Sequence, residues 1–228
     1  SGYTFAYFSN SATSTTPLTA SQLCFSNSGD IWVHFTLATR STTTSLTSNN
    51  NPSTFGQSVI FTATVTASAG NPGANGSVTF KDGASTITGC SNVALNASSQ
   101  ATCTTPALDA PGSPHSITAV YSGATSGSTT WNGSTSSPLS QTVNKASSTT
   151  TVTCTAGPFV YNGSAKTPCS ATVTGAGGLN QSLGVSYSNN LDAGTATASA
   201  SYAGDANHTA SSDSKTFTID KADSTTTV

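Results

Sequence analysis

Three copies of a short hydroxyl-rich motif constrain this chain more than any other feature. Each copy reads Ser-Thr-Thr-Thr with an apolar residue close behind, at residues 41–46, 148–152 and 224–228. A strand pattern with apolar residues at every second position precedes each copy, and a basic residue separates the two. These basic residues are Arg40, Lys145 and Lys221. A last strand, a short joint and a new first strand, repeated along the chain, are typical of tandem modules.

The composition predicts strands and almost no helix. Only 6% of the residues are charged, and the chain contains no Glu and no Met. Thr, which is abundant, is a good strand former, whereas most strong helix formers are scarce. Disorder is the rival interpretation for so polar a chain. The clean alternation of apolar and polar residues over 59–65 argues against disorder and for an all-β fold.

Charge and hydropathy exclude two classes of partner. The formal net charge is −2 and the six basic residues are scattered, so there is no electrostatic footprint for nucleic acid. No apolar run approaches the roughly 20 residues of a membrane-spanning helix, so no membrane span is expected. Cysteines that pair within modules, as argued below, predict a secreted or cell-surface location.

The segment before the first joint and the segment after it differ in strand number. Residues 1–40 hold three expected strands, at 3–8, 22–25 and 31–37, where a sandwich usually needs about seven. This segment is therefore expected to be an incomplete β segment or the end of a preceding module. Residues 41–145 show about seven short strands separated by turn signals, which is the pattern of a β-sandwich.

Several motifs within residues 41–145 are similar to bacterial Ig-like domain repeats. They are Asn51-Pro52-Ser53, Gly56–Val59, Gly76–Phe80 and His115–Tyr121. The resemblance implies an extracellular β-sandwich repeat of the kind found in bacterial surface proteins and adhesins. One departure is Ala124, where an acidic residue often stands, and this weakens the case for a cation site at that turn.

Residues 146–221 resemble a second family, the MBG-type repeat of bacterial surface proteins. The matching pieces are Tyr161-Asn162-Gly163, Pro168-Cys169, Ala171–Gly175 and Gly194–Gly204. This resemblance implies a β-rich repeat without enzymatic activity of its own. Together the two resemblances predict tandem Ig-like β-sandwich modules, and the short joints predict an elongated array.

Four of the five cysteines are expected to form disulfides within their own modules. The expected pairs are Cys90–Cys103 and Cys154–Cys169. Their midpoints fall in turn signals, at 96–99 and at 161–163, so each pair should lie nearly opposite across two connected strands. A zinc site would need CxxC spacing and histidine partners, which are missing. Cys24 is left over, either as a buried thiol or bonded to a cysteine of another chain or of a segment outside this sequence.

No constellation of residues predicts catalysis or a cofactor. The three histidines, His34, His115 and His208, lie in different segments, and the absence of Glu leaves only Asp for paired carboxylates. Asp205 with Asn207 offers too few oxygens for calcium. An internal isopeptide bond would need a buried lysine, whereas Lys81 and Lys145 are expected in a turn and a joint. We therefore expect neither an enzyme nor a metal site.

Exposed aromatic side chains leave carbohydrate binding open. Trp131, expected in a loop, could stack on a sugar ring. The alternative is that its ring lies over the end of the sandwich. Tyr161 and Tyr187 are weaker candidates, and six Asn-x-Ser/Thr sequons indicate surface turns more firmly than glycans.

The predicted function is structural: a non-catalytic extracellular repeat protein that forms a stalk or filament on the bacterial surface. The alternative is an adhesin or carbohydrate-binding module for a surface glycan. Residues 222–228 are either the first strand of a further module in a longer chain or a strand donated to another copy. Donation would use Ser224, Thr225, Thr226, Thr227 and Val228, and it would assemble copies head to tail.

Overall fold

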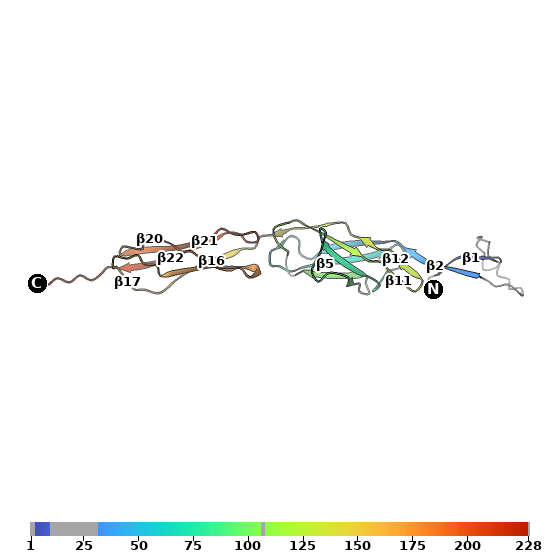
Figure 1. The fold of residues 1–228 in the computed structure, drawn as a ribbon, viewed down its shortest axis with the longest axis horizontal. Helices are drawn as coiled ribbons and strands as arrows, with labels where there is room; N and C mark the ends of the chain where they lie inside the picture. The colour runs from blue at the N-terminus through green and yellow to red at the C-terminus, as the bar shows by residue number, and fades with distance from the viewer. Residues whose placement is uncertain (1–2, 10–31, 106–107, 228) are drawn as a thin grey trace. The chain divides into compact units, whose positions relative to one another are not determined.

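The structure is a computed structural model that describes residues 3–9, 32–105 and 108–227. In these ranges it is built from β-strands and one 3-10 turn, Ala176–Gly178 (Figure 1), so the predicted all-β fold is confirmed. Two compact units divide the chain. The first comprises residues 1–49, 60–105 and 115–140, and the second comprises 50–59, 106–114 and 141–228.

Two facing sheets supply the core of the first unit. One sheet has the order β3 (Thr42–Ser48), β5 (Val59–Ala67) and β9 (Gln100–Thr105). The other has the order β13 (Ser134–Thr135), β10 (His115–Tyr121), β6 (Ser77–Asp82) and β7 (Ser85–Thr86), with β14 (Leu139–Gln141) beside β10 and β8 (Val93–Ala94) beside β6. Every second side chain of β5 is buried, as its alternation predicts. Phe61, Phe80, Ile117 and Tyr121 are the largest side chains of this core.

The described strands of residues 1–40 share a sheet with a hairpin from later in the chain. β1 (Tyr3–Ser9) pairs with β2 (Trp32–Arg40), and β2 runs parallel to β12 (Thr129–Trp131), which pairs with β11 (Ala124–Ser126). Figure 1 shows β2, β12 and β11 close together. The strand expected at 22–25, with Cys24, lies outside the described residues. The expected strand 31–37 is present as the longer β2.

Small residues fill the core of the second unit. One sheet has the order β16 (Ser148–Cys154), β18 (Cys169–Gly175) and β19 (Asn180–Leu183). The other has the order β17 (Phe159–Val160), β22 (Ser211–Asp220), β21 (Gly194–Tyr202) and β20 (Ser186–Ser188). Ala196, Ala198 and Ala200 of β21 are buried beside Phe217 and Ile219. The rings of Phe159 and Tyr187 meet Phe217 edge to face, at 5.6 and 6.2 Å between centroids.

A short strand near the start of each predicted module pairs in parallel with that module's last strand. β4 (Ser53–Thr54) pairs with β15 (Val143–Asn144), and β17 pairs with β22. Backbone bonds extend both pairings: Phe55 N donates to Asn144 O (2.8 Å), and Tyr161 N donates to Asp220 O (2.9 Å). The same closure therefore occurs twice, in segments that the sequence assigns to different families.

Both predicted disulfides are present, in different surroundings. Cys154 and Cys169 are directly opposed partners on β16 and β18, and both are half-buried. Cys90, in contrast, precedes β8 and accepts a bond from Phe80 N of one sheet, while Cys103 belongs to β9 of the facing sheet. Their disulfide therefore joins the two sheets through the core. The midpoint argument had the right pair but expected a link across a hairpin, which this bond is not.

We predict that mild reduction of the folded protein opens the two disulfides in sequence. Thiol attack requires access to sulfur, and Cys90 and Cys103 are only 2% and 1% exposed. Cys154–Cys169 should therefore be reduced first, and Cys90–Cys103 only when the first unit unfolds. Alkylation of released thiols at increasing reductant, read by peptide mass spectrometry, checks this order. Simultaneous release from both pairs under native conditions would contradict it.

Candidate functional site: two clamps on the entering chain

The loop between β21 and β22 holds the segment that leads into β16. Ala146 N donates to Asn207 O (2.9 Å), and Thr209 N donates to Ala146 O (2.8 Å), so Ala146 and His208 form a parallel bridge. Lys145 Nζ adds a bond to the backbone oxygen of Asp205 (2.5 Å). We call this loop, residues 204–210, the second clamp. It fixes the entering backbone at the first residue after the joint.

Alternate hydroxyls of the repeated motif continue the attachment. Ser148 Oγ donates to Thr209 O (2.8 Å) and lies 2.7 Å from Ser211 Oγ, which is also 2.8 Å from Thr150 Oγ1. Thr149 and Thr151, at the positions between, point outward and are exposed. Each second hydroxyl of the motif is therefore a bonding group, and the others form part of the solvated face.

The same arrangement recurs in the first unit. Arg40 pairs with Trp131, and Asn132 N donates to Arg40 O (3.0 Å), as Thr209 does to Ala146. Thr42 Oγ1 donates to Asn132 O (2.6 Å), and the hydroxyls of Thr42 and Thr44 lie 2.8 and 2.7 Å from Ser134 Oγ. We call residues 123–133 the first clamp. Here the loop is extended into the β11–β12 hairpin, which pairs with three residues of β2.

Each clamp begins at a glycine that no other residue can replace without strain. Gly123 and Gly204 have φ values of +75° and +86°. A Cβ on Gly123 would lie 2.8 Å from the oxygen of Trp131, and one on Gly204 would lie 2.8 Å from the oxygen of His208. The matched contacts confirm that Trp131 and His208 occupy equivalent places in the two clamps.

The second clamp pairs a buried histidine with an exposed carboxylate. His208 is 5% exposed; its Nδ1 lies 2.9 Å from Asp205 Oδ1, and its Nε2 lies 2.9 Å from the carbonyl oxygen of Ala176. A carboxylate and a carbonyl oxygen both accept hydrogen bonds, so the surroundings of the two ring nitrogens favour the imidazolium form, which donates from both. The bond to Asp205 raises the pKa of His208. Hydrogen bonds from Tyr202 and from His208 lower the pKa of Asp205.

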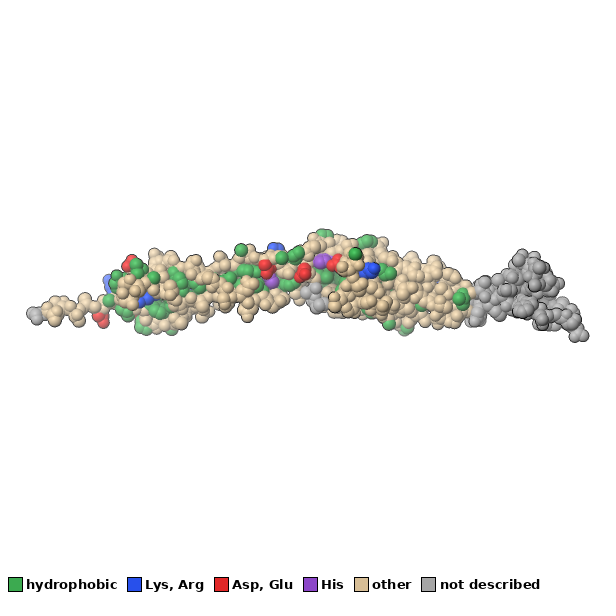
Figure 2. Space-filling view, viewed as in Figure 1, with side chains coloured by type: hydrophobic (Ala, Val, Ile, Leu, Met, Phe, Trp, Pro, Cys, Tyr) green, Lys and Arg blue, Asp and Glu red, His purple; other side chains and the backbone are tan. Residues whose placement is uncertain are grey.

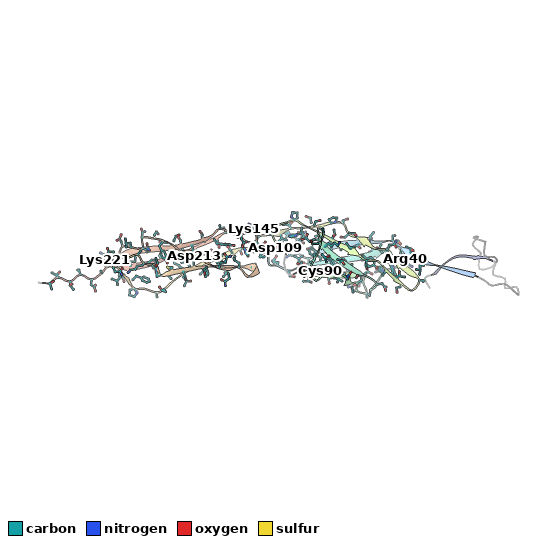
Figure 3. All side chains as sticks on the ribbon, viewed as in Figure 1. Arg40, Cys90, Asp109, Lys145, Asp213 and Lys221 are labelled. Atoms are coloured by element: carbon teal, nitrogen blue, oxygen red, sulfur yellow. A yellow bond between two sulfur atoms is a disulfide. The ribbon has the colours of Figure 1, made fainter. Side chains whose placement is uncertain are left out.

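Asn207 connects the second clamp to a loop from the middle of the chain, within the same unit. Its Oδ1 accepts from Ala110 N (2.8 Å), and its Nδ2 donates to Asp109 Oδ1 (3.2 Å). Figure 3 labels Asp109 and Lys145, which both reach this loop. The ring of Phe55 meets His208 edge to face at 5.3 Å. The amide of this sequon is therefore engaged in protein contacts.

The donors around Asp205 explain why this turn is not built for a cation. Its oxygens accept from Tyr202 Oη (2.7 Å), from the backbone nitrogens of Asn207 and His208 (2.7 Å each), and from the His208 ring. Within residues 3–9, 32–105 and 108–227, no three His, Cys or Asp side chains are grouped so that they could hold a metal ion.

The three aromatic candidates for sugar stacking have different surroundings. Trp131 lies in strand β12, not in a loop, and is only 9% exposed, which leaves little of its ring for a ligand. Tyr187 is half-buried, and its hydroxyl bonds the backbone nitrogen and oxygen of Cys169. Tyr161 is 40% exposed and lies directly after β17. It is the candidate that best presents a ring to solvent.

Sequence reasoning found the entering segments and missed the clamps that hold them. The sequence relates Asp205 to Asn207 only as a weak cation pair, and it presents His208 as an isolated histidine. The available signal was internal: Tyr121 and Gly123 precede the first clamp loop as Tyr202 and Gly204 precede the second.

Residues 46–144 match the family described as Bacterial Ig-like domain (group 3). This segment is therefore an Ig-like β-sandwich by both sequence and structure, while the resemblance of 146–221 to the MBG-type repeat stays a prediction. No curated protein matches the chain.

Two solved structures with similarity to the chain contain fibronectin-like or Ig domains. The fibronectin(III)-like modules of CbhA from Clostridium thermocellum align at 15% identity over 77% of this chain and 94% of that chain, with a TM-score of 0.28. The mouse nectin-like molecule 4 ectodomain (Ig1–Ig3) aligns at 12% identity over 81% of this chain and 66% of that chain, with a TM-score of 0.32. Neither TM-score supports an inference about function. In the part of the chain that the structure describes, no helix has the length and hydropathy needed to cross a membrane.

We predict that the second clamp weakens as the pH rises above neutrality. The folded pKa of His208 exceeds its ordinary value of 6.5, so its stabilisation is complete below about pH 6.5 and is lost as the pH rises through the folded pKa. Asp205, with a lowered pKa, has the opposite sign and loses its contribution only in strong acid. Tyr202, Lys145 and Asp109 are the other titratable groups at this loop.

Urea unfolding of the second unit at pH 6 and pH 8.5, followed by circular dichroism, measures this loss. Wild type should be less stable at pH 8.5, and the His208→Gln variant, which cannot titrate, should lose most of the difference. His115→Gln in the first unit is the matched control. An NMR titration in which the His208 ring deprotonates below its ordinary pKa would contradict the assignment.

Proposed function

We propose that this protein is a non-catalytic, extracellular structural repeat protein that forms part of a stalk or filament on a bacterial surface. The observation that carries the proposal is the repeated clamp: each unit binds the chain segment entering it by backbone bonds and by alternate hydroxyls of the same motif. Two disulfides and a match to a bacterial Ig-like family support a secreted or cell-surface location.

The parallel closures suit a chain that carries tension. β17 follows the entering segment and β22 leads out of the fold, and the two run parallel. Tension applied to both chain ends pulls two such strands in opposite directions along their length. Their hydrogen bonds are then loaded together in shear and do not open one after another. β4 and β15 repeat this arrangement.

The surface also supports a structural role over recognition of a charged partner. Figure 2 shows a face on which charged side chains are few and scattered. In the second unit, the outward row Ser186, Ser199 and Ser214 crosses three strands in register, and all three residues are exposed. Such a face is solvated without attracting oppositely charged molecules.

Single-molecule pulling at both ends tests the proposal. We expect a discrete unfolding peak for each unit. Tyr161→Pro, which removes the backbone N–H that donates to Asp220 O, should lower the peak of the second unit and cost about 1 kcal/mol of stability. Tyr161→Phe keeps this donor and should unfold at the wild-type force. Unfolding without resolved peaks in the wild-type protein would refute a load-carrying role.

A carbohydrate-binding or adhesive function is the second candidate, and a groove beside Tyr161 favours it. The groove has a volume of about 660 Å³ and is lined by residues 151–159 of one chain segment and by residues of β22. Phe159 lies in it, and the exposed Tyr161 follows two residues later. A glycan array probed with the whole chain would show a hit that Tyr161→Ala abolishes and Tyr187→Phe retains. An array without hits leaves the structural function.

A further inference from the structure

The segment that enters β16 has a close copy at the end of β22. Residues 143–152 read VNKASSTTTV, and residues 219–228 read IDKADSTTTV, so seven of ten positions are identical. In the structure, Lys221–Thr227 are exposed and lie outside the strands. Figure 3 labels Lys221, where β22 leads into this segment.

Five of the seven identical positions contact the second clamp, Ser211 or the core. Lys145 bonds the Asp205 oxygen, Ala146 is 5% exposed and forms the bridge, and Val152 is 1% exposed in the core. Ser148 and Thr150, which bond Ser211, are also retained as Ser224 and Thr226.

The side chains at the positions that differ do not contact the clamp. Asn144 and Ser147 are exposed, and Asp220 and Asp223 replace them. Val143 becomes Ile219, another buried apolar residue. Sequence identity within this repeat therefore covers every side chain that contacts the clamp or the core, apart from the Val-to-Ile exchange, and also two exposed threonines, Thr149 and Thr151.

The copy does not fit the first clamp. There, the bridging residue is Arg40, opposite the neutral Trp131, and its guanidinium donates to the backbone oxygen of Ala69. In the second clamp, the bridging residue is Ala146, opposite the His208 imidazolium. An arginine at this position would bring a further cation beside His208, in a clamp that already holds the Lys145 ammonium. Ala222 therefore marks residues 221–228 as a segment for a clamp of the second type.

We propose that residues 221–228 are an entry strand for a module of the second type, with a Gly-Asp-x-Asn-His clamp. This inference rests on the proposed function as a tandem repeat and names the partner: a second copy of residues 153–221 joined behind Val228. The segment supplies this copy with the groups that residues 145–152 supply to the second unit. Lys221 donates to the clamp Asp oxygen, Ala222 forms the bridge, and Val228 fills the core.

In this proposal, the module that binds residues 221–228 belongs to the same polypeptide and not to another molecule. In each existing copy, the second clamp already holds Ala146 of its own chain. An identical strand from another molecule gains no new contact and must compete with a tethered one, whose effective concentration is of millimolar order. Exchange between copies is therefore disfavoured.

A fusion of residues 1–228 with a second copy of 153–221 tests the proposal. Hydrogen exchange at residues 224–227 should slow to the rates of 148–151, about 100-fold or more below the unfused chain. Ala222→Arg should abolish most of this protection, whereas Asp223→Ser, which restores the residue found at 147, should leave it unchanged. A second fusion, to residues 47–145 with their hairpin clamp, should leave 222–227 unprotected.

Three outcomes would overturn the proposal. The first is a folded second copy with free hydrogen exchange at residues 222–227. The second is equal protection of these residues in the fusion to residues 47–145. The third is concentration-dependent protection in the unfused chain, which would indicate strand exchange between molecules. If Ala222→Arg unfolds the added copy, Ser224→Ala, which removes one hydroxyl and adds no charge, should still raise exchange at 224–227. Pulling of the unfused chain keeps its two peaks in every case, so the proposed function is tested separately.

Discussion

Two backbone hydrogen bonds at Ala146 are the constraint on which the second unit depends. They fix where the entering strand begins, and in a strand with a side-chain period of two this also fixes which residues face inward. Val152 reaches the core and Thr150 reaches Ser211 only in this register. A shift by one residue would turn Val152 out to solvent and put a threonine hydroxyl in its place in the core.

Register matters more here than in most sandwiches because the core is small. Alanines on β21 supply much of the buried surface, and burial of an alanine releases far less apolar area from water than burial of leucine or phenylalanine. The deficit is met by ordered polar contacts and by the Cys154–Cys169 link between opposed strands. Each of these needs its partner directly opposite, so the register set at Ala146 supports them all.

Local patterns predicted the strands, whereas the clamps depend on contacts between distant residues. The alternation in β5 is a period-two signal within nine residues, and it is read without knowledge of the fold. Ala146 and Asn207, in contrast, are brought together by the closure of two sheets. The local sequence around either residue does not predict its contact with the other. Trp131 illustrates the same limit, because its burial depends on β2 pairing with a hairpin some ninety residues further along the chain.

The disulfides show where a local argument gives the right pair for an incomplete reason. Cys154 and Cys169 are opposed in register on β16 and β18, but the chain between them first crosses to the other sheet as β17. The midpoint between Cys90 and Cys103 falls in a turn, but the chain changes sheet there, so the bond crosses the core.

A chain that contains so few charges nevertheless buries the His208 ring beside the exposed Asp205 carboxylate in the second clamp, and we relate this to discrimination between entering segments. Such a pair is weak evidence for stability, since the cost of removing the ring from water offsets much of the attraction. It can still disfavour a wrong partner, because a further positive charge placed beside the ring is repelled. The His208 imidazolium accepts the small side chain of Ala146 opposite it and disfavours an arginine there. The entering segments at Arg40 and at Ala146 are similar in sequence, and this difference in charge matches each of them to its own clamp.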